Sequence, residues 1–129
     1  MEQIGRGGMA EVFRAKLKGI GGFEKIVAVK RILPSFARDP AFRDQFLAEA
    51  KLSAQLTHPN IVSVFEVGIE NETPFMILEW IDGFNLKELM NHHCDEGKQI
   101  SIPVACEIAI QIARALQYAH SFLSPENKQ

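Results

Sequence analysis

The chain has 129 residues, of which 47% are hydrophobic and 23% are charged, and its formal net charge is -2 at pH 7. This composition supports a folded domain with an apolar core and excludes the disordered and fibrous classes. The slight negative charge and the lack of lysine or arginine runs argue against a nucleic-acid partner, and no apolar stretch is long enough to span a membrane. The first residues lack the basic start and apolar core of a signal peptide, so we expect a reducing, cytoplasmic location. Cys94 and Cys106 lack the spacing of a disulfide framework and are predicted to be buried or incidental thiols.

A glycine-rich stretch, Gly5-Arg6-Gly7-Gly8-Met9-Ala10-Glu11-Val12, lies near the start of the chain. Its glycines lack Cβ atoms, which lets backbone N-H groups approach phosphate oxygens and permits the positive φ angles of a tight turn. From Phe13 to Lys18 apolar and basic side chains alternate. This period predicts a strand, whereas a dinucleotide-binding turn is followed by a helix. We therefore expect a hairpin turn that covers phosphates.

A second strand, Val27-Ala28-Val29-Lys30, follows a glycine-containing loop at residues 18–25. Ala28 and Lys30 are two residues apart and therefore point to the same face of the strand. A small side chain beside a lysine leaves room for a flat base, and the lysine supplies a cation. Taken alone, however, an ordinary surface lysine at the end of a strand explains these residues better.

A helix of about four turns is predicted from Asp39, with Asp39 as N-cap and Pro40 at the first helical position. One stripe of this helix contains Phe42, Phe46, Glu49, Ser53 and Leu56. The carboxylate of Glu49 is expected to be buried in this stripe, where it would need a cationic partner. Lys30 is the natural candidate.

Two further motifs follow the helix, His58-Pro59-Asn60-Ile61-Val62 and Glu79-Trp80-Ile81-Asp82-Gly83. The apolar runs at residues 61–69 and 74–81 predict two strands joined by a hairpin at residues 70–73. Together with the strands near the start of the chain, they predict a five-stranded antiparallel sheet.

The glycine turn, the strand lysine, the helix glutamate and the two later motifs resemble, in order and spacing, the eukaryotic-like serine/threonine protein kinases of bacteria. The resemblance extends to about Phe122. It implies an α+β fold, with a kinase small lobe made of a five-stranded antiparallel sheet and helix C, followed by the interlobe hinge and the first two helices of the large lobe. The implied boundaries are residues 1–81 for the small lobe and 82–129 for the start of the large lobe.

The resemblance implies a site for ATP, in which Lys30 contacts the α and β phosphates and is held by Glu49. The other implied site residues are Ile4, Val12, Ala28 and Leu86 around the adenine, Gly5, Gly7 and Gly8 over the phosphates, Leu78 at the back of the pocket, and Glu79 and Ile81 with backbone groups at the adenine edge. The implied reaction transfers the γ-phosphoryl group of ATP to serine or threonine of a protein whose identity the sequence does not indicate. Mg²⁺ is the implied cofactor, with its ligands outside this chain.

Two helices are predicted after the hinge, one capped by Asn85 and ending near His93, and one capped by Ser101 and covering residues 102–122. The neighbouring His92, His93 and Cys94 diverge around a helix, so a zinc site is disfavoured. The second helix is apolar except for one strip, Glu107, Gln111, Arg114 and Gln117. Such a helix is normally enclosed by other elements.

The last residues, 121–129, predict a polar turn, and Asn127 is not assigned as a metal ligand because no His-Arg-Asp motif precedes it. Residues 1–5 are too short for a full first strand. We therefore expect the sequence to be a piece of a kinase domain, cut before the catalytic loop and inactive by itself. A non-catalytic, pseudokinase-like nucleotide-binding or interaction module is the alternative, and a purely structural α+β domain is the least favoured hypothesis.

Overall fold

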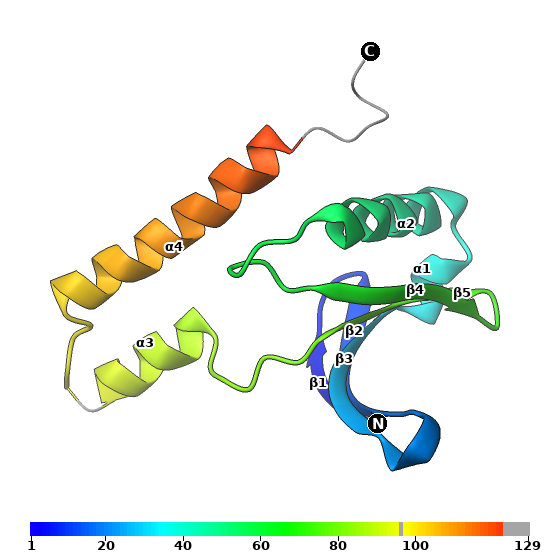
Figure 1. The fold of residues 1–129 in the computed structure, drawn as a ribbon, viewed down its shortest axis with the longest axis horizontal. Helices are drawn as coiled ribbons and strands as arrows, with labels where there is room; N and C mark the ends of the chain where they lie inside the picture. Colours follow the sequence, from blue (N-terminus) through cyan, green and yellow to red (C-terminus); the bar gives the residue numbers. More distant parts are fainter. Residues whose placement is uncertain (96, 123–129) are drawn as a thin grey trace. The chain divides into compact units, whose positions relative to one another are not determined.

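A computed structural model of the chain describes residues 1–95 and 97–122 (Figure 1). Most of the predicted polar turn at residues 121–129, including Asn127, lies outside the described residues. The chain divides into two compact units. The first unit contains Met1–Thr57 and Val62–Trp80, and the second contains His58–Ile61 and the described residues from Ile81 onward.

The first unit contains the predicted five-stranded antiparallel sheet. In spatial order its strands are β1 (Glu2–Arg6), β2 (Ala10–Lys18), β3 (Glu24–Ile32), β5 (Thr73–Glu79) and β4 (Val64–Glu70). A one-turn 3-10 helix, Ile20–Gly22, lies in the loop between β2 and β3. The expectation that the first residues are too short for a full strand was wrong, because β1 has five residues, an ordinary strand length, and pairs with β2.

The predicted helix of the first unit is α2 (Pro40–Gln55). Its N-terminus is capped as expected, since the Asp39 side chain accepts a hydrogen bond of 2.9 Å from the Ala41 N-H. A shorter helix, α1 (Pro34–Ala37), precedes it and was not predicted. Four residues are too few to show a helical period, so α1 left no pattern in the sequence.

The core of the first unit lies between α2 and one face of the sheet (Figure 1). Its buried members are Ile32, Phe46, Ala50 and Met76. The buried stripe of α2 therefore passes through Phe46 and Ala50, and the prediction that Glu49 is buried was wrong. The Glu49 side chain is 54% exposed, because Glu49 and Ala50 are about 100° apart around the helix and Ala50 is the residue that faces the sheet.

The hairpin between β4 and β5 turns at Asn71 and Glu72, whose φ angles are 47° and 62°. Two consecutive residues with positive φ are typical of a type I′ turn, whose twist matches that of the flanking strands. The hairpin predicted at residues 70–73 is therefore confirmed, with Glu70, the last residue of β4, paired with Thr73, the first residue of β5.

Gly68 on β4 packs against the ring of Phe75 on the neighbouring strand, and a Cβ added at Gly68 would lie 2.6 Å from the ζ carbon of Phe75. We expect Gly68→Ala to lower the free energy of unfolding by about 1–3 kcal/mol, because the ring has to move. Urea denaturation followed by the fluorescence of Trp80, the chain's one tryptophan, measures this. Gly83→Ala is the control, since its added Cβ meets no heavy atom within 4 Å. Equal stability of the two variants would contradict the prediction.

The second unit contains α3 (Leu86–Asp95) and α4 (Ile102–Ser121). The N-terminus of α3 is capped as predicted. The Asn85 side chain accepts from the Glu88 N-H at 2.9 Å, and the Glu88 side chain accepts from the Asn85 N-H at 3.0 Å. Ser101 occupies the cap position of α4, but its side chain makes no capping hydrogen bond.

None of the described residues of α4 is buried, and Ile102, Ile112 and Leu116 are among its exposed apolar side chains. Cys94 and Cys106 are free and exposed on α3 and α4. Within the described ranges, no helix is long and apolar enough to cross a lipid bilayer.

Candidate functional site

Lys30 and Glu49 form an ion pair between β3 and α2, with 2.5 Å between Lys30 Nζ and Glu49 Oε1. The sequence predicted this pair, although for a buried glutamate. The side chains are 26% and 54% exposed. Pairs of this exposure stabilise a fold by less than about 1 kcal/mol, so the pair holds the ammonium group in place more than it stabilises the domain.

One face of the sheet presents Val12, Ala28, Lys30 and Leu78 together. Val12 lies opposite Lys30 in the β2–β3 ladder, and Ala28 lies opposite Leu78 in the β3–β5 ladder. Residues directly opposite each other in antiparallel strands project to the same face, and so do residues two apart on one strand. This is the face that α2 covers, since Met76, which lies opposite Lys30, belongs to the core.

The glycine turn joins β1 to β2, as predicted. The Gly7 N-H donates to the Ala10 carbonyl at 2.7 Å and closes the turn. Gly5 and Gly8 face open space, because a Cβ at either position would meet no heavy atom within 4 Å. The expected positive φ angles are absent from these glycines, and the described glycines that adopt them are Gly21, Gly22 and Gly97. The turn itself therefore does not demand glycine at 5 and 8.

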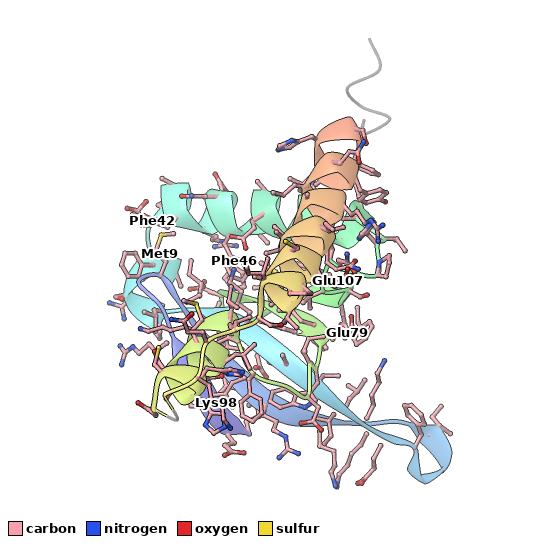
Figure 2. The ribbon with its side chains drawn as sticks, turned by 90° about the vertical axis from the view of Figure 1, so that its left-hand side faces the viewer. Met9, Phe42, Phe46, Glu79, Lys98 and Glu107 are labelled. Atoms are coloured by element: carbon pink, nitrogen blue, oxygen red, sulfur yellow. The ribbon has the colours of Figure 1, made fainter. Side chains whose placement is uncertain are left out.

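A small recess lies behind the glycine turn, with a volume of about 50 Å³, and Lys30 and Glu49 are among its lining residues. Met9, Phe42 and Phe46, which also line it, are labelled in Figure 2. The Leu33 N-H donates to the Met9 carbonyl at 2.9 Å, which attaches the end of the turn to the residue after β3. The recess is too small for a nucleotide, since ligand pockets usually exceed about 300 Å³.

The remaining predicted residues are distributed over both units. Ile4 lies at an irregularity of the β1–β2 ladder and is 48% exposed. Glu79 ends β5, where its N-H donates to the Ser63 carbonyl at 2.9 Å. Ile81 and Leu86 belong to the second unit, so their place in the site stays a prediction.

Hydrogen bonds inside the second unit attach Asn60 to α4, a contact that the sequence did not predict. Asn60 Nδ2 donates to the Gln111 backbone carbonyl at 2.9 Å and to Gln111 Oε1 at 2.6 Å, and Gln111 in turn donates to Glu107. The ring of His58 lies beside that of Tyr118, with 5.2 Å between centroids. Gln111 and Glu107 stood out as part of a polar strip, but nothing in the local pattern indicated that Asn60 would bind them.

Among the residues that the structure describes, no group of three or more His, Cys, Asp or Glu side chains could hold a metal ion. These residues therefore offer no cluster of side chains that would hold Mg²⁺.

The sequence pattern of the protein tyrosine and serine/threonine kinase family matches residues 1–122. The chain belongs to this family. It is 36% identical over 122 residues to tyrosine-protein kinase MasK of Myxococcus xanthus, covering 95% of the chain and 19% of that protein. It is 38% identical over 122 residues to the probable serine/threonine-protein kinase PknB of Corynebacterium glutamicum, covering 91% of the chain and 18% of the relative. The chain thus spans about a fifth of the length of these relatives.

The kinase fold predicted from the sequence is confirmed by comparison with a solved structure. The crystal structure of the PknI kinase domain of Mycobacterium tuberculosis resembles the chain with a TM-score of 0.68 at 28% sequence identity. The match covers 92% of this chain and 46% of that one. The five-stranded sheet with its helices is accordingly the small-lobe part and the beginning of the large-lobe part of a kinase domain.

Proposed function

We propose that the chain is the ATP-binding part of a protein kinase that transfers the γ-phosphoryl group of ATP to serine or threonine side chains of proteins. The observation that carries this proposal is the Lys30–Glu49 ion pair, on the sheet face that also presents Val12 and Ala28. A cation held beside a small side chain, next to an open glycine turn, suits a triphosphate joined to a flat base.

In this proposal the Lys30 ammonium contacts the α and β phosphates. Glu49 accepts one N-H of that ammonium and so fixes where the charge lies. Gly5, Gly7 and Gly8 cover the phosphates. The open space at Gly5 and Gly8 supports this role, because side chains there would occupy the space that a ligand needs.

The adenine would lie against Val12 and Ala28, with Ile4 and Leu86 as further apolar contacts and Leu78 at the back. Glu79 and Ile81 would contribute backbone groups. At Glu79 the N-H already bonds to Ser63, so an adenine amino group would have to donate to the Glu79 carbonyl oxygen. ATP and Mg²⁺ are the cofactors of this proposal, and we further propose that the chain acts in the cytoplasm, where ATP is supplied.

The nucleotide site is tested with the variant Glu49→Ala, by ATP titration of a chain that is extended through both lobes. We expect ATP affinity to fall about three- to tenfold, because one hydrogen bond that positions Lys30 is lost, and such bonds are worth about 0.5–1.5 kcal/mol. Glu24→Ala is the matched control. Glu24 also pairs with a lysine across two elements, with 2.8 Å to Lys16, but far from the proposed phosphates in the sheet register. Equal affinities in the two variants would count against the proposal.

The choice between serine/threonine and tyrosine as acceptor is tested separately. The relatives carry names of both kinds, and we favour serine/threonine on the overall resemblance. Phosphoamino-acid analysis of a generic protein substrate after incubation with labelled ATP distinguishes them. ATP binding without any transfer by the extended chain would favour the alternative, a non-catalytic regulatory module.

A further inference from the structure

We propose that a polar recess at the corner of α1, α2 and the β4–β5 turn binds the phosphorylated side chain of a serine or threonine in a protein segment. The recess has a volume of about 450 Å³. Pro34, Ala37, Arg38, Arg43, Glu72 and Thr73 line it. It shares no residue with the proposed nucleotide site.

The two arginines of the recess are available for a ligand. In the described part of the chain, neither Arg38 nor Arg43 forms an ion pair or a side-chain hydrogen bond. By contrast, Arg14 and Arg31 on the sheet are paired with glutamates. Asp39, which lies between Arg38 and Arg43 in sequence, uses a carboxylate oxygen to cap α2.

The local structure brings these two arginines to one place. Arg38 is the C-cap of α1, and its N-H donates to the Phe36 carbonyl. Arg43 lies in the first turn of α2, where its N-H donates to the Asp39 carbonyl at 3.1 Å. The β4–β5 turn borders the same recess, and Thr73 Oγ1 donates to the Asn71 carbonyl at 3.3 Å.

The charged side chains of the recess favour an anion. Two guanidinium groups stand against the single carboxylate of Glu72. A phosphomonoester carries about -1.5 to -2 charges at pH 7 and three acceptor oxygens, and arginine binds such groups through two parallel N-H donors. A carboxylate ligand, with one charge, would gain less.

The size and the apolar part of the recess favour a phosphorylated residue over a free phosphate ion or a nucleotide. The volume exceeds what a lone phosphate fills, and Pro34 and Ala37 offer an apolar wall to the carbons of the residue. No aromatic side chain among the described residues lines the recess to stack on a base. The inference rests on the proposed function in one respect, because a serine/threonine kinase produces such phosphorylated side chains.

The test is fluorescence anisotropy with a short fluorescein-labelled peptide that has one phosphoserine flanked by alanines, and with its unphosphorylated twin. The phosphopeptide should bind the chain, and the double variant Arg38→Gln/Arg43→Gln should weaken binding at least about tenfold, the low end for lost charge-assisted hydrogen bonds. Lys18→Gln/Lys51→Gln removes the same charge from exposed positions elsewhere in the first unit. It should change the affinity by less than about twofold.

Arg38→Lys/Arg43→Lys keeps the charge but not the planar fork, so we expect an affinity between those of the wild type and the glutamine variant. Circular dichroism melting verifies that all variants fold. The proposal would be overturned if the two peptides bound equally well, or if Lys18→Gln/Lys51→Gln lost as much phosphopeptide affinity as Arg38→Gln/Arg43→Gln. It would also be overturned if inorganic phosphate bound as tightly as the phosphopeptide in a competition experiment. ATP titration of the wild type distinguishes this proposal from the proposed function. If the proposed function is wrong, ATP does not bind; if the proposed phosphate recess is wrong, the phosphopeptide does not bind.

Discussion

Lys30→Ala is expected to lower ATP affinity about 10- to 100-fold while leaving the fold nearly intact. The proposed phosphate contact is a charge-assisted one, and such contacts are worth about 1.5–3 kcal/mol. Phosphoryl transfer by a chain with both lobes should fall about 100-fold or more, since a donor aimed at developing charge contributes that much. Isothermal titration calorimetry with ATP and a phosphorylation assay measure the two effects.

Lys16→Ala is the matched control for Lys30→Ala. Lys16 also lies on the sheet and also forms an ion pair, with Glu24 at 2.8 Å, but the side chains of both partners are exposed to solvent. Circular dichroism should show that both variants keep the wild-type spectrum. If Lys30→Ala bound ATP as tightly as Lys16→Ala, the proposed nucleotide site would be wrong.

Phe46→Ala should lower the free energy of unfolding of the first unit by about 3–5 kcal/mol, the usual cost of removing a buried aromatic ring. Phe46 is 6% exposed and packs in the core with Ile32, Ala50 and Met76. Because α2 also carries Glu49, a loosened helix should weaken ATP binding as well. Urea denaturation followed by Trp80 fluorescence measures the stability.

The control for Phe46→Ala is Leu52→Ala on the same helix. The Leu52 side chain is 55% exposed, so its removal should change the free energy of unfolding by less than about 1 kcal/mol. A comparable loss in both variants would mean that α2 is not held by the core cluster of Ile32, Phe46, Ala50 and Met76. Lys30→Ala should differ from Phe46→Ala in keeping wild-type stability.

Much of the fold followed from local patterns. The alternation after Val12 indicated β2, Asp39 and Pro40 marked the start of α2, and Asn85 marked the start of α3, all confirmed by the structure. These features depend on residues within a few positions of one another, so the sequence displays them directly.

The pairing of Lys30 with Glu49 was also predicted, although for an incomplete reason. The helical stripe indicated roughly which side of α2 faces the sheet, and Lys30 was the available cation. The stripe could not show that Ala50, rather than Glu49, lies at the centre of the interface, because the rotation of a helix about its axis is set by the surface against which it packs.

The sequence by itself therefore determined the family, the order of the strands along the chain and the lysine and glutamate of the proposed nucleotide site. Only the tertiary structure decided that Asn60 binds Gln111 and that Arg38 and Arg43 share one recess with the β4–β5 turn. The physical reason is sequence distance. Contacts between residues that are far apart in the chain depend on how whole elements pack, and no periodicity or capping pattern within either segment encodes its partner.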